Sequence, residues 1–413
     1  MPEPLRPDSE QQIQSILAQH DRVLAVGNRT KPPLSQCADT TLISLGAMTG
    51  MIQYEPSEFT FTAYAGTRVS DIESELHSRR QYLPFDPLLL QSGATLGGTV
   101  ASGVAGPGRF RYGGVRDFLL GARLLCGDGA WTNVGGKVVK NAAGFDVPKM
   151  LVGSLGRFGL ISEMTFKVFP RPVSLLTLKV ACEDDRQAVR RIANAAASRW
   201  ELDAIEYAAS SHMIYLRLGG PHDVNDSLSR EIESKWGSDV SRLEDFAAAE
   251  TWAAINELRW QPSLGGSSGV SPGESTSDSA NGLSNESGST DGSRATVMDR
   301  DQPAFVIKVP TTPKQFLSLR DKFAEDSDRV AMHLSVAGAT TWMRFHGDDR
   351  AAQVRAALNE QHLVGLCVQG PFDSPWIGQR DVTAMERRIK DAIDPPHKFP
   401  SFEPVSIGAN LND

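Results

Sequence analysis

The amino-acid sequence predicts an α+β protein made of two globular parts. The first 160 residues alternate short apolar strands with glycine-rich turns. Two later stretches, 174–236 and 303–368, show strands and helices in a similar order. Between them, residues 262–300 are dominated by Ser, Gly, Asp and Asn, so a low-complexity segment divides the second part.

Periodicity predicts several elements of the first part. Residues 59–66 alternate in the manner of a half-buried strand. Residues 68–79 place Val69, Ile72 and Leu76 on one face of a helix. Residues 124–134 are predicted to form two strands joined by a Gly-Asp-Gly turn.

The second part repeats one order of elements. After the low-complexity segment, the pattern predicts a strand, a helix, two paired strands, a helix and a strand, at 303–309, 312–324, 329–336, 340–345, 350–361 and 362–368. This βαββαβ order occurs in ferredoxin-like units. Before the segment, β, α, β, β and α are predicted at 174–181, 185–198, 203–209, 212–218 and 224–236. Because two such halves can share one antiparallel sheet with helices on one face, we expect a second domain over residues 171–390.

The low-complexity segment carries too little apolar surface to offset the entropy cost of ordering it. We therefore expect residues 262–300 to be a disordered insert within the second domain. The first domain is expected over residues 1–170, and residues 391–413 form a C-terminal tail.

The overall charge excludes one broad class of function. The chain has 42 Lys and Arg against 50 Asp and Glu, and no stretch clusters the basic residues that a nucleic-acid surface needs. Its four cysteines are far apart, and its polar start shows no secretory segment. No apolar run approaches the roughly 20 residues of a membrane span. We expect a cytoplasmic protein that contacts the inner membrane face only through partners.

Four glycine-bearing stretches, at 25–31, 91–108, 111–121 and 152–161, stand out in the first part. None has the glycine spacing of a Rossmann fingerprint or of a P-loop, and each alone is typical of a turn. Glycine loops can still bind phosphate, because missing Cβ atoms let backbone N–H groups converge on an anion. Four such loops together favour an anionic cofactor held locally.

Two adjacent motifs carry a family resemblance. Residues 140–146 read Lys-Asn-Ala-Ala-Gly-Phe-Asp, and residues 153–159 follow as Gly-Ser-Leu-Gly-Arg-Phe-Gly. Together with residues 97–129, they resemble the FAD domain of the vanillyl-alcohol-oxidase (PCMH-type) flavoproteins, and most closely the FAD-binding subunits of bacterial glycolate oxidase. This implies a PCMH-type FAD-binding domain of two α+β subdomains, followed by a cap domain. The resemblance covers about residues 20–172; beyond these it rests on element order and on the helix at 387–395.

The resemblance implies a role for each loop. The pyrophosphate of FAD would lie against Gly27, Asn28, Arg29, Thr30 and Lys31; the dinucleotide would be lined by Gly97, Gly98, Thr99 and Gly103; and the adenosine end would meet Gly159 and Ile161 through the backbone. Glycines 153, 156 and 159 would let the chain turn close to the cofactor. Asp146 is expected to fix a turn by accepting backbone N–H groups. Because the first loop holds no His or Cys, we expect FAD to be bound non-covalently.

The sequence also departs from the family. The 2-hydroxy-acid dehydrogenases of the family carry a His-rich metal motif in the second domain, which is missing here. His333 and His346 are therefore expected to be strand or loop residues, and no metal site is predicted. Arg344 is the candidate for a substrate carboxylate, with a solvent-facing strand residue as the alternative. His212, Arg217, Arg109 and Arg111 stay open in the same way.

Two functions remain. The first is an FAD-dependent oxidoreductase subunit that oxidises glycolate, or a related 2-hydroxy acid such as D-lactate, at its CH–OH group, giving glyoxylate from glycolate. The second is a flavin-binding subunit for assembly or electron transfer, which the missing His motif favours. In either case the resemblance implies a paralogous FAD subunit and an iron-sulfur subunit as partners, because this chain lacks the cysteine spacing of a cluster.

Overall fold

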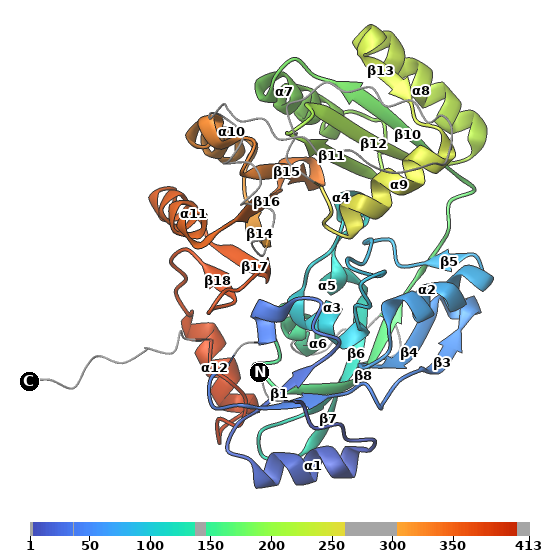
Figure 1. Cartoon of the computed structure of the whole chain (residues 1–413). Helices are drawn as coiled ribbons and strands as arrows, with labels where there is room; N and C mark the ends of the chain where they lie inside the picture. The colour runs from blue at the N-terminus through green and yellow to red at the C-terminus, as the bar shows by residue number, and fades with distance from the viewer. Residues whose placement is uncertain (1–2, 36, 137–145, 261–303, 403–413) are drawn as a thin grey trace, which may run out of the picture.

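A computed structural model of the chain describes residues 3–35, 37–136, 146–260 and 304–402. The predicted insert lies outside the described residues, as do residues 140–145 of the first motif and residues 403–413 of the expected tail. The described elements form an N-terminal part and a second part built on one large sheet (Figure 1).

Two sheets organise the N-terminal part. A parallel pair, β1 (Val23–Val26) and β2 (Thr41–Ser44), packs near helix α1 (Glu10–Gln19). A five-stranded antiparallel sheet has the order β3 (Met51–Glu55), β4 (Thr60–Tyr64), β8 (Leu160–Lys167), β6 (Leu119–Leu125) and β7 (Trp131–Gly135). The remaining elements are α2 (Val69–Ser78), α3 (Leu96–Ser102), α4 (Arg109–Tyr112), α5 (Val115–Phe118), α6 (Val147–Leu151), the pair β5 (Gln81–Tyr82) and β9 (Phe169–Pro170), and the 3-10 turns η1 (Pro32–Ser35) and η2 (Pro56–Glu58).

The predicted elements of this part are confirmed. Strand β4 and helix α2 lie where periodicity places them, and Val69, Ile72 and Leu76 are all buried on one face of α2. Strands β6 and β7 pair antiparallel across the Gly-Asp-Gly turn. Buried side chains of α2, β4 and β6 contribute to one large apolar core, and Leu24, Val26 and Leu42 of β1 and β2 form a smaller cluster.

The second part is one antiparallel sheet shared by two halves. Its order is β13 (Val240–Arg242), β10 (Ser174–Ala181), β12 (Met213–Gly220), β11 (Ala204–Ala208), β15 (Ala331–Ser335), β16 (Thr340–His346), β14 (Ala304–Pro310), β17 (Gly365–Gln369) and β18 (Trp376–Ile377). The two halves meet where Tyr207 of β11 pairs with Leu334 of β15. The expected shared sheet is therefore confirmed.

Helices cover both faces of this sheet. Four predicted helices, α7 (Asp185–Ala196), α8 (His222–Trp236), α10 (Pro313–Lys322) and α11 (Asp348–Glu360), pack on the outer face and close an apolar core with it. Helix α9 (Asp245–Asn256) lies on the opposite, inner face, where the Trp252 indole N–H donates to Thr177 Oγ1 at 2.9 Å. The expectation of helices on one face is corrected by α9. The short turns η3 (Gly237–Asp239), η4 (Ala324–Asp326) and η5 (Val336–Gly338) complete the part.

The end of the chain returns to the N-terminal part. Helix α12 (Ala384–Ile393) and Phe399 pack against the first core, although the expected boundary placed residues up to 390 with the second domain. Lys390 fixes this return, because its ammonium donates to the carbonyl of Arg157 at 2.7 Å and to Asp394 at 2.6 Å. Within the described part of the chain, no helix is both long enough and apolar enough to cross a membrane.

A buried ion pair joins the two parts. Arg217 on β12 donates to Asp86 Oδ2 at 2.6 Å, and the two side chains are 9% and 13% exposed. The same oxygen accepts the Gly108 N–H at 2.7 Å. The Arg217 guanidinium also lies over the Trp252 ring. One carboxylate thus ties β12 to the turn before α4.

Asp86→Asn tests this tie. The substitution keeps the shape and removes the carboxylate bonded to Arg217, leaving Asp203 as the remaining nearby negative charge, so we expect the free energy of unfolding to fall by about 3 kcal/mol. The control is Asp226→Asn, which removes a bond to Arg242 whose side chains are 46% and 41% exposed, and which should cost less than about 1 kcal/mol. Urea unfolding measures both. Equal losses would show that Asp86 does not anchor the two parts.

Candidate functional site

A cavity lies between the parallel pair β1–β2 and the five-stranded sheet. It encloses roughly 790 Å³ of free space, counting the part open to solvent. Its wall is formed by residues 25–31, Leu34, Ser35, Leu45, Ala65, Thr95, Gly97, Gly98, Ala101, Ser102, Leu155, Gly156, Gly159 and Ile161. Three of the four glycine-bearing stretches therefore contribute to one wall.

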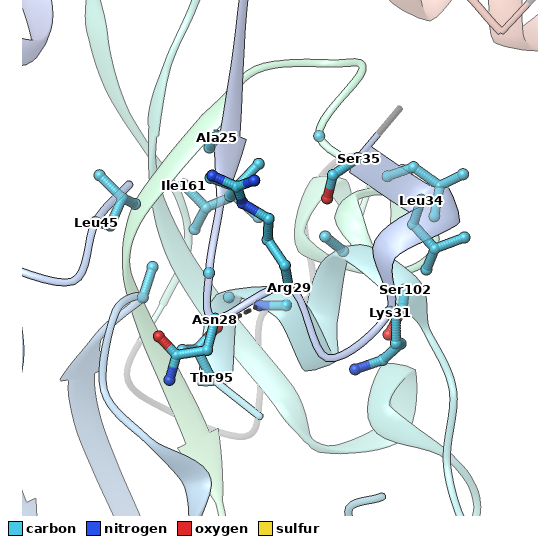
Figure 2. Close-up of a pocket in the computed structure, with 18 of the residues that line it drawn as sticks. Ala25, Asn28, Arg29, Lys31, Leu34, Ser35, Leu45, Thr95, Ser102 and Ile161 are labelled. Atoms are coloured by element: carbon cyan, nitrogen blue, oxygen red, sulfur yellow. Dashed lines mark hydrogen bonds between the residues drawn. The ribbon is translucent and has the colours of Figure 1, made fainter. Parts of the chain in front are cut away.

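The first loop, residues 27–31, crosses closely over the start of α3. A Cβ on Gly27 would lie 2.1 Å from Thr95 Oγ1, so only glycine allows this crossing. Asn28 anchors the loop by donating to the Gly93 carbonyl at 2.8 Å. Arg29 adopts a φ of 51°, the left-handed conformation. Residues 28–31 of this bend are not glycines, and the Arg29 and Lys31 side chains extend from it in different directions (Figure 2).

The loop presents donors that have no protein acceptor. Among the described residues, the backbone N–H groups of residues 27–31 make no hydrogen bond. Lys31 is 6% exposed, and within the described part of the chain its ammonium makes one hydrogen bond, to Thr30 Oγ1 at 3.3 Å. Burial lowers the pKa of Lys31 to about 8, and the charge of Glu257 partly opposes this shift. Such a set of unbonded backbone donors beside one buried lysine is suited to an anion.

Helix α3 holds the remaining loops in place. Thr95 caps the helix by accepting the Gly98 N–H, and a Cβ on Gly97 would lie 3.0 Å from Ala65. The carbonyls of Val100 and Ala101 accept the N–H groups of residues 153 and 155, at 3.0 and 2.9 Å. The loop at 153–159 is thus hydrogen-bonded to α3.

Two of the predicted dinucleotide residues do not line the cavity. Thr99 is buried in α3, and its Oγ1 has no partner among the described residues. Gly103 ends the helix with a φ of 62°, and a Cβ there would lie 3.0 Å from the Gly153 nitrogen. Both residues belong to α3 or its end, next to lining residues, and do not face the cavity themselves.

The structure shows that position 159 needs a glycine for packing against β6, and not for the expected turn. Gly153 and Gly156 have positive φ angles of 81° and 70°, as turning glycines require. Gly159 does not; a Cβ there would lie 2.7 Å from Leu124 Cδ1 and 2.8 Å from the Leu125 carbonyl. Gly159 borders the cavity, but its missing side chain makes room for β6. Ile161 follows it into β8.

The second part contributes to the frame of the cavity. Glu257, just after α9, accepts the N–H groups of Gln91 and Ser92 at 2.7 and 3.2 Å, and the Ser92 hydroxyl at 2.7 Å. Leu89 donates its N–H to the Asn256 carbonyl. Helix α9 therefore fixes the loop that leads into α3.

The other candidate residues have protein partners. Arg344 donates to the Leu258 carbonyl at 3.0 Å from the inner face of the sheet, so the solvent-facing alternative is wrong. His212 contacts Tyr207 and Asp185, and Arg111 pairs with Glu201. Asp146 pairs with Lys149 and accepts no capping N–H, so its expected turn bond is corrected.

His333 is a buried strand residue. Its Nε2 lies 2.7 Å from Glu206 Oε2. Among the described residues, no group of three or more His, Cys, Asp or Glu side chains is arranged to hold a metal ion.

Sequence reasoning missed the apolar wall of the cavity. Ala25, Leu34, Leu45 and Leu155 carry no chemical signal, because any of them is an ordinary core residue until the loops close around it. Thr95 could have been found, since a threonine before Leu96 and the following glycines is a helix N-cap pattern.

The role assigned to Gly159 can be tested with Gly159→Ala. The added Cβ would push into β6, so we expect the flavin-free protein to lose about 1–3 kcal/mol of stability. Gly46→Ala is the control, because that exposed glycine meets only the Ser44 hydroxyl, at 3.3 Å. Thermal melting without added flavin measures both. A Gly159→Ala chain that melts like the wild type would contradict the packing role.

Comparison with known proteins agrees with this cavity. Residues 4–135 match a family described as FAD binding domain. The chain is 32% identical to the glycolate oxidase subunit GlcE of Escherichia coli K12 over 213 residues, 51% of this chain and 59% of that protein. It is 29% identical to a D-lactate dehydrogenase of Anaerostipes hadrus over 143 residues, 35% of this chain and 30% of the relative. These matches span less than two thirds of either relative.

A solved structure reaches further along the fold. An alkyldihydroxyacetonephosphate synthase superposes on 95% of this chain and 75% of its own, with a TM-score of 0.64 and 14% identity. At that identity the likeness shows a shared fold. The sequence matches give one conclusion: residues 4–135 carry an FAD-binding domain of the PCMH type.

Proposed function

We propose that this cavity binds FAD non-covalently and that the chain is the FAD-binding subunit of a 2-hydroxy acid oxidoreductase complex. The observation that carries the proposal is the convergence of three glycine-bearing loops and the buried Lys31 on one cavity. The unbonded N–H groups of residues 27–31 suit the FAD pyrophosphate, and Lys31 supplies a matching charge. No histidine or cysteine is among the described residues of the wall, which supports non-covalent binding.

The names of the relatives suggest the reaction class. They include glycolate oxidase subunits, D-lactate dehydrogenases and D-2-hydroxyglutarate dehydrogenases, whose named substrates share a hydroxyl group beside a carboxylate. When bound, FAD accepts the electron pair and hydrogen that leave such a carbon. In our proposal glycolate is the first substrate, giving glyoxylate, and D-lactate is the runner-up.

The relatives named as subunits also suggest partners. GlcE and a GlcD of Bacillus subtilis are both called glycolate oxidase subunits. Electrons must leave the flavin after each turnover, and this chain has only four cysteines, which lie in different parts of the fold. An iron-sulfur cluster held by four thiolates would therefore belong to a partner, beside a second flavin subunit.

A second candidate is a flavin-binding subunit without substrate oxidation of its own. The region expected to hold the family's metal motif, around η5 and β16, carries Trp342 and Arg344 but no paired histidines. The two candidates predict the same cofactor and differ in what the isolated chain does with substrate.

Anaerobic mixing separates the two candidates. The purified chain should release yellow FAD on acid precipitation, because no covalent bond retains it. Adding glycolate or D-lactate without oxygen should then bleach the flavin absorption of the intact chain. FAD that stays in the pellet contradicts non-covalent binding. Bleaching that appears only after a second flavin subunit is added supports the assembly candidate.

Lys31→Met tests the pyrophosphate contact. Losing one charged hydrogen bond should weaken FAD binding about 10- to 100-fold at pH 7. Because burial lowers the pKa of Lys31 to about 8, the wild-type flavin-free chain holds this proton below pH 8 and loses it above. FAD affinity should then fall up to about tenfold per pH unit above 8 in the wild type, and not in Lys31→Met.

Quenching of FAD fluorescence on binding measures these affinities at pH 7 and 9. Lys314→Met, an exposed lysine on α10, is the control and should bind like the wild type. A Lys31→Met chain with wild-type affinity at both pH values would remove Lys31 from the cofactor site.

A further inference from the structure

The inner face of the large sheet carries three side chains in one row. Backbone pairing places Lys308 of β14 opposite Trp342 of β16, and Trp342 opposite His333 of β15. The residues on either side of each belong to the helix-covered core or face it, so the row lies on the opposite face, toward the N-terminal part. Adjacent strands are about 4.8 Å apart, which puts Lys308 and His333 about 10 Å apart along the row.

His333 is held by a carboxylate that also accepts two other hydrogen bonds. Its Nε2 lies 2.7 Å from Glu206 Oε2, and both side chains are nearly inaccessible. The other oxygen of Glu206 accepts the Ser335 hydroxyl at 2.8 Å and the Val336 N–H at 3.0 Å. A carboxylate accepts, so Nε2 carries the hydrogen and Nδ1 is left with a free lone pair. This Nδ1 is buried and has no partner among the described residues.

A second polar atom beside His333 is also without a partner. The Trp260 ring lies 5.2 Å from the His333 ring and 6.0 Å from the Trp342 ring. Its Nε1 is buried and unpaired among the described residues. Two neighbouring buried atoms, one donor and one acceptor, without partners indicate a place for a polar ligand.

Lys308 provides an unpaired cation at the other end of the row. In the described chain it has no hydrogen bond or ion pair. Burial lowers the pKa of Lys308 to about 8, and the charge of Arg109 lowers it further. A half-buried lysine beside a second cation, with no carboxylate partner among the described residues, is suited to bind an anion.

This row adjoins the apolar end of the FAD cavity. Leu34 and Leu155 line the cavity and also belong to the apolar cluster that contains Trp342 of the row. The same cluster includes Leu366, which pairs with Lys308 across β14 and β17. A ligand on the row would therefore lie at the end of the cavity where the N-terminal part meets the sheet.

We propose that this row binds the 2-hydroxy acid, with Lys308 pairing with its carboxylate and His333 accepting the proton of its hydroxyl. The inference rests on the proposed function. In the step, the substrate O–H bond breaks and its proton goes to His333 Nδ1. The C–H bond breaks, and its hydrogen with the electron pair goes to the oxidised flavin, so that C=O forms and a 2-oxo acid leaves. Glu206 is a positioning residue, because it fixes the imidazole with Nδ1 free.

Oxalate binding tests the carboxylate contact without turnover. Calorimetry should show that Lys308→Met weakens oxalate binding about tenfold or more, while FAD content and melting temperature stay near those of the wild type. Lys179→Met, on the same sheet in β10, is the control and should bind oxalate like the wild type. Equal oxalate affinity in Lys308→Met and the wild type overturns the carboxylate site, as does a wild type that binds no oxalate.

Flavin reduction tests the proton acceptor. His333→Gln should slow anaerobic reduction by glycolate or D-lactate about 100-fold or more, with oxalate affinity within about threefold of the wild type. His212→Gln, which removes a partly exposed histidine next to the same sheet, is the control. If His333→Gln does not fold, Glu206→Gln should lower kcat with KM within about threefold of the wild type.

The outcomes distinguish this inference from the proposed function. A wild type that binds FAD and is bleached by no 2-hydroxy acid contradicts the proposed function. A wild type that is bleached, alongside His333→Gln and Glu206→Gln chains that reduce at the wild-type rate, contradicts only the role of the row.

Discussion

The anchoring of α3 is the constraint on which the cavity depends. Thr95, before this helix, packs against Gly27 of the first loop, and Gly97 packs against Ala65. The carbonyls of its last turn accept hydrogen bonds from the N–H groups of residues 153 and 155. Each contact is a close backbone approach, so small residues are required where the segments cross. The three loops come from separate parts of the sequence, and their contacts with α3 and with Thr95 before it hold them side by side.

The second part of the chain also holds the segment that leads into α3. Glu257 and Asn256, at the end of α9, hold the backbone that leads into α3, and Asp86 ties that region to Arg217 on the sheet. A shift of the sheet would therefore move the loops at the cofactor site. The same contacts, with the cluster shared by Leu34, Leu155 and Trp342, place the inner face of the sheet at the end of the cavity.

Much of the fold could be predicted because its signals are local. The period of β4 and α2, and the repeated strand and helix order of the second part, follow from which side chains are apolar. The position of α9 on the inner face could not be predicted. Its Trp252 contacts Thr177 and Arg217, which are distant in the sequence and come close only when the sheet has formed. At the site, the glycine loops were visible in sequence, whereas Gly159 was misjudged because its neighbour Leu125 belongs to another strand.

The net charge of the chain gives no sign of an anion-binding site, because such a site depends on a few local cations. The chain carries a net charge of −8, yet Lys31 is buried and Lys308 is half-buried, and among the described residues neither has a carboxylate bonded to it. Burying an unpaired ammonium costs free energy, and in each case the cost lowers the lysine pKa to about 8. An anion that enters regains this energy by pairing with the charge. Two such positions, one in the glycine-loop cavity and one on the adjoining sheet, match the two anions that the proposed reaction brings together, a dinucleotide and a carboxylic acid.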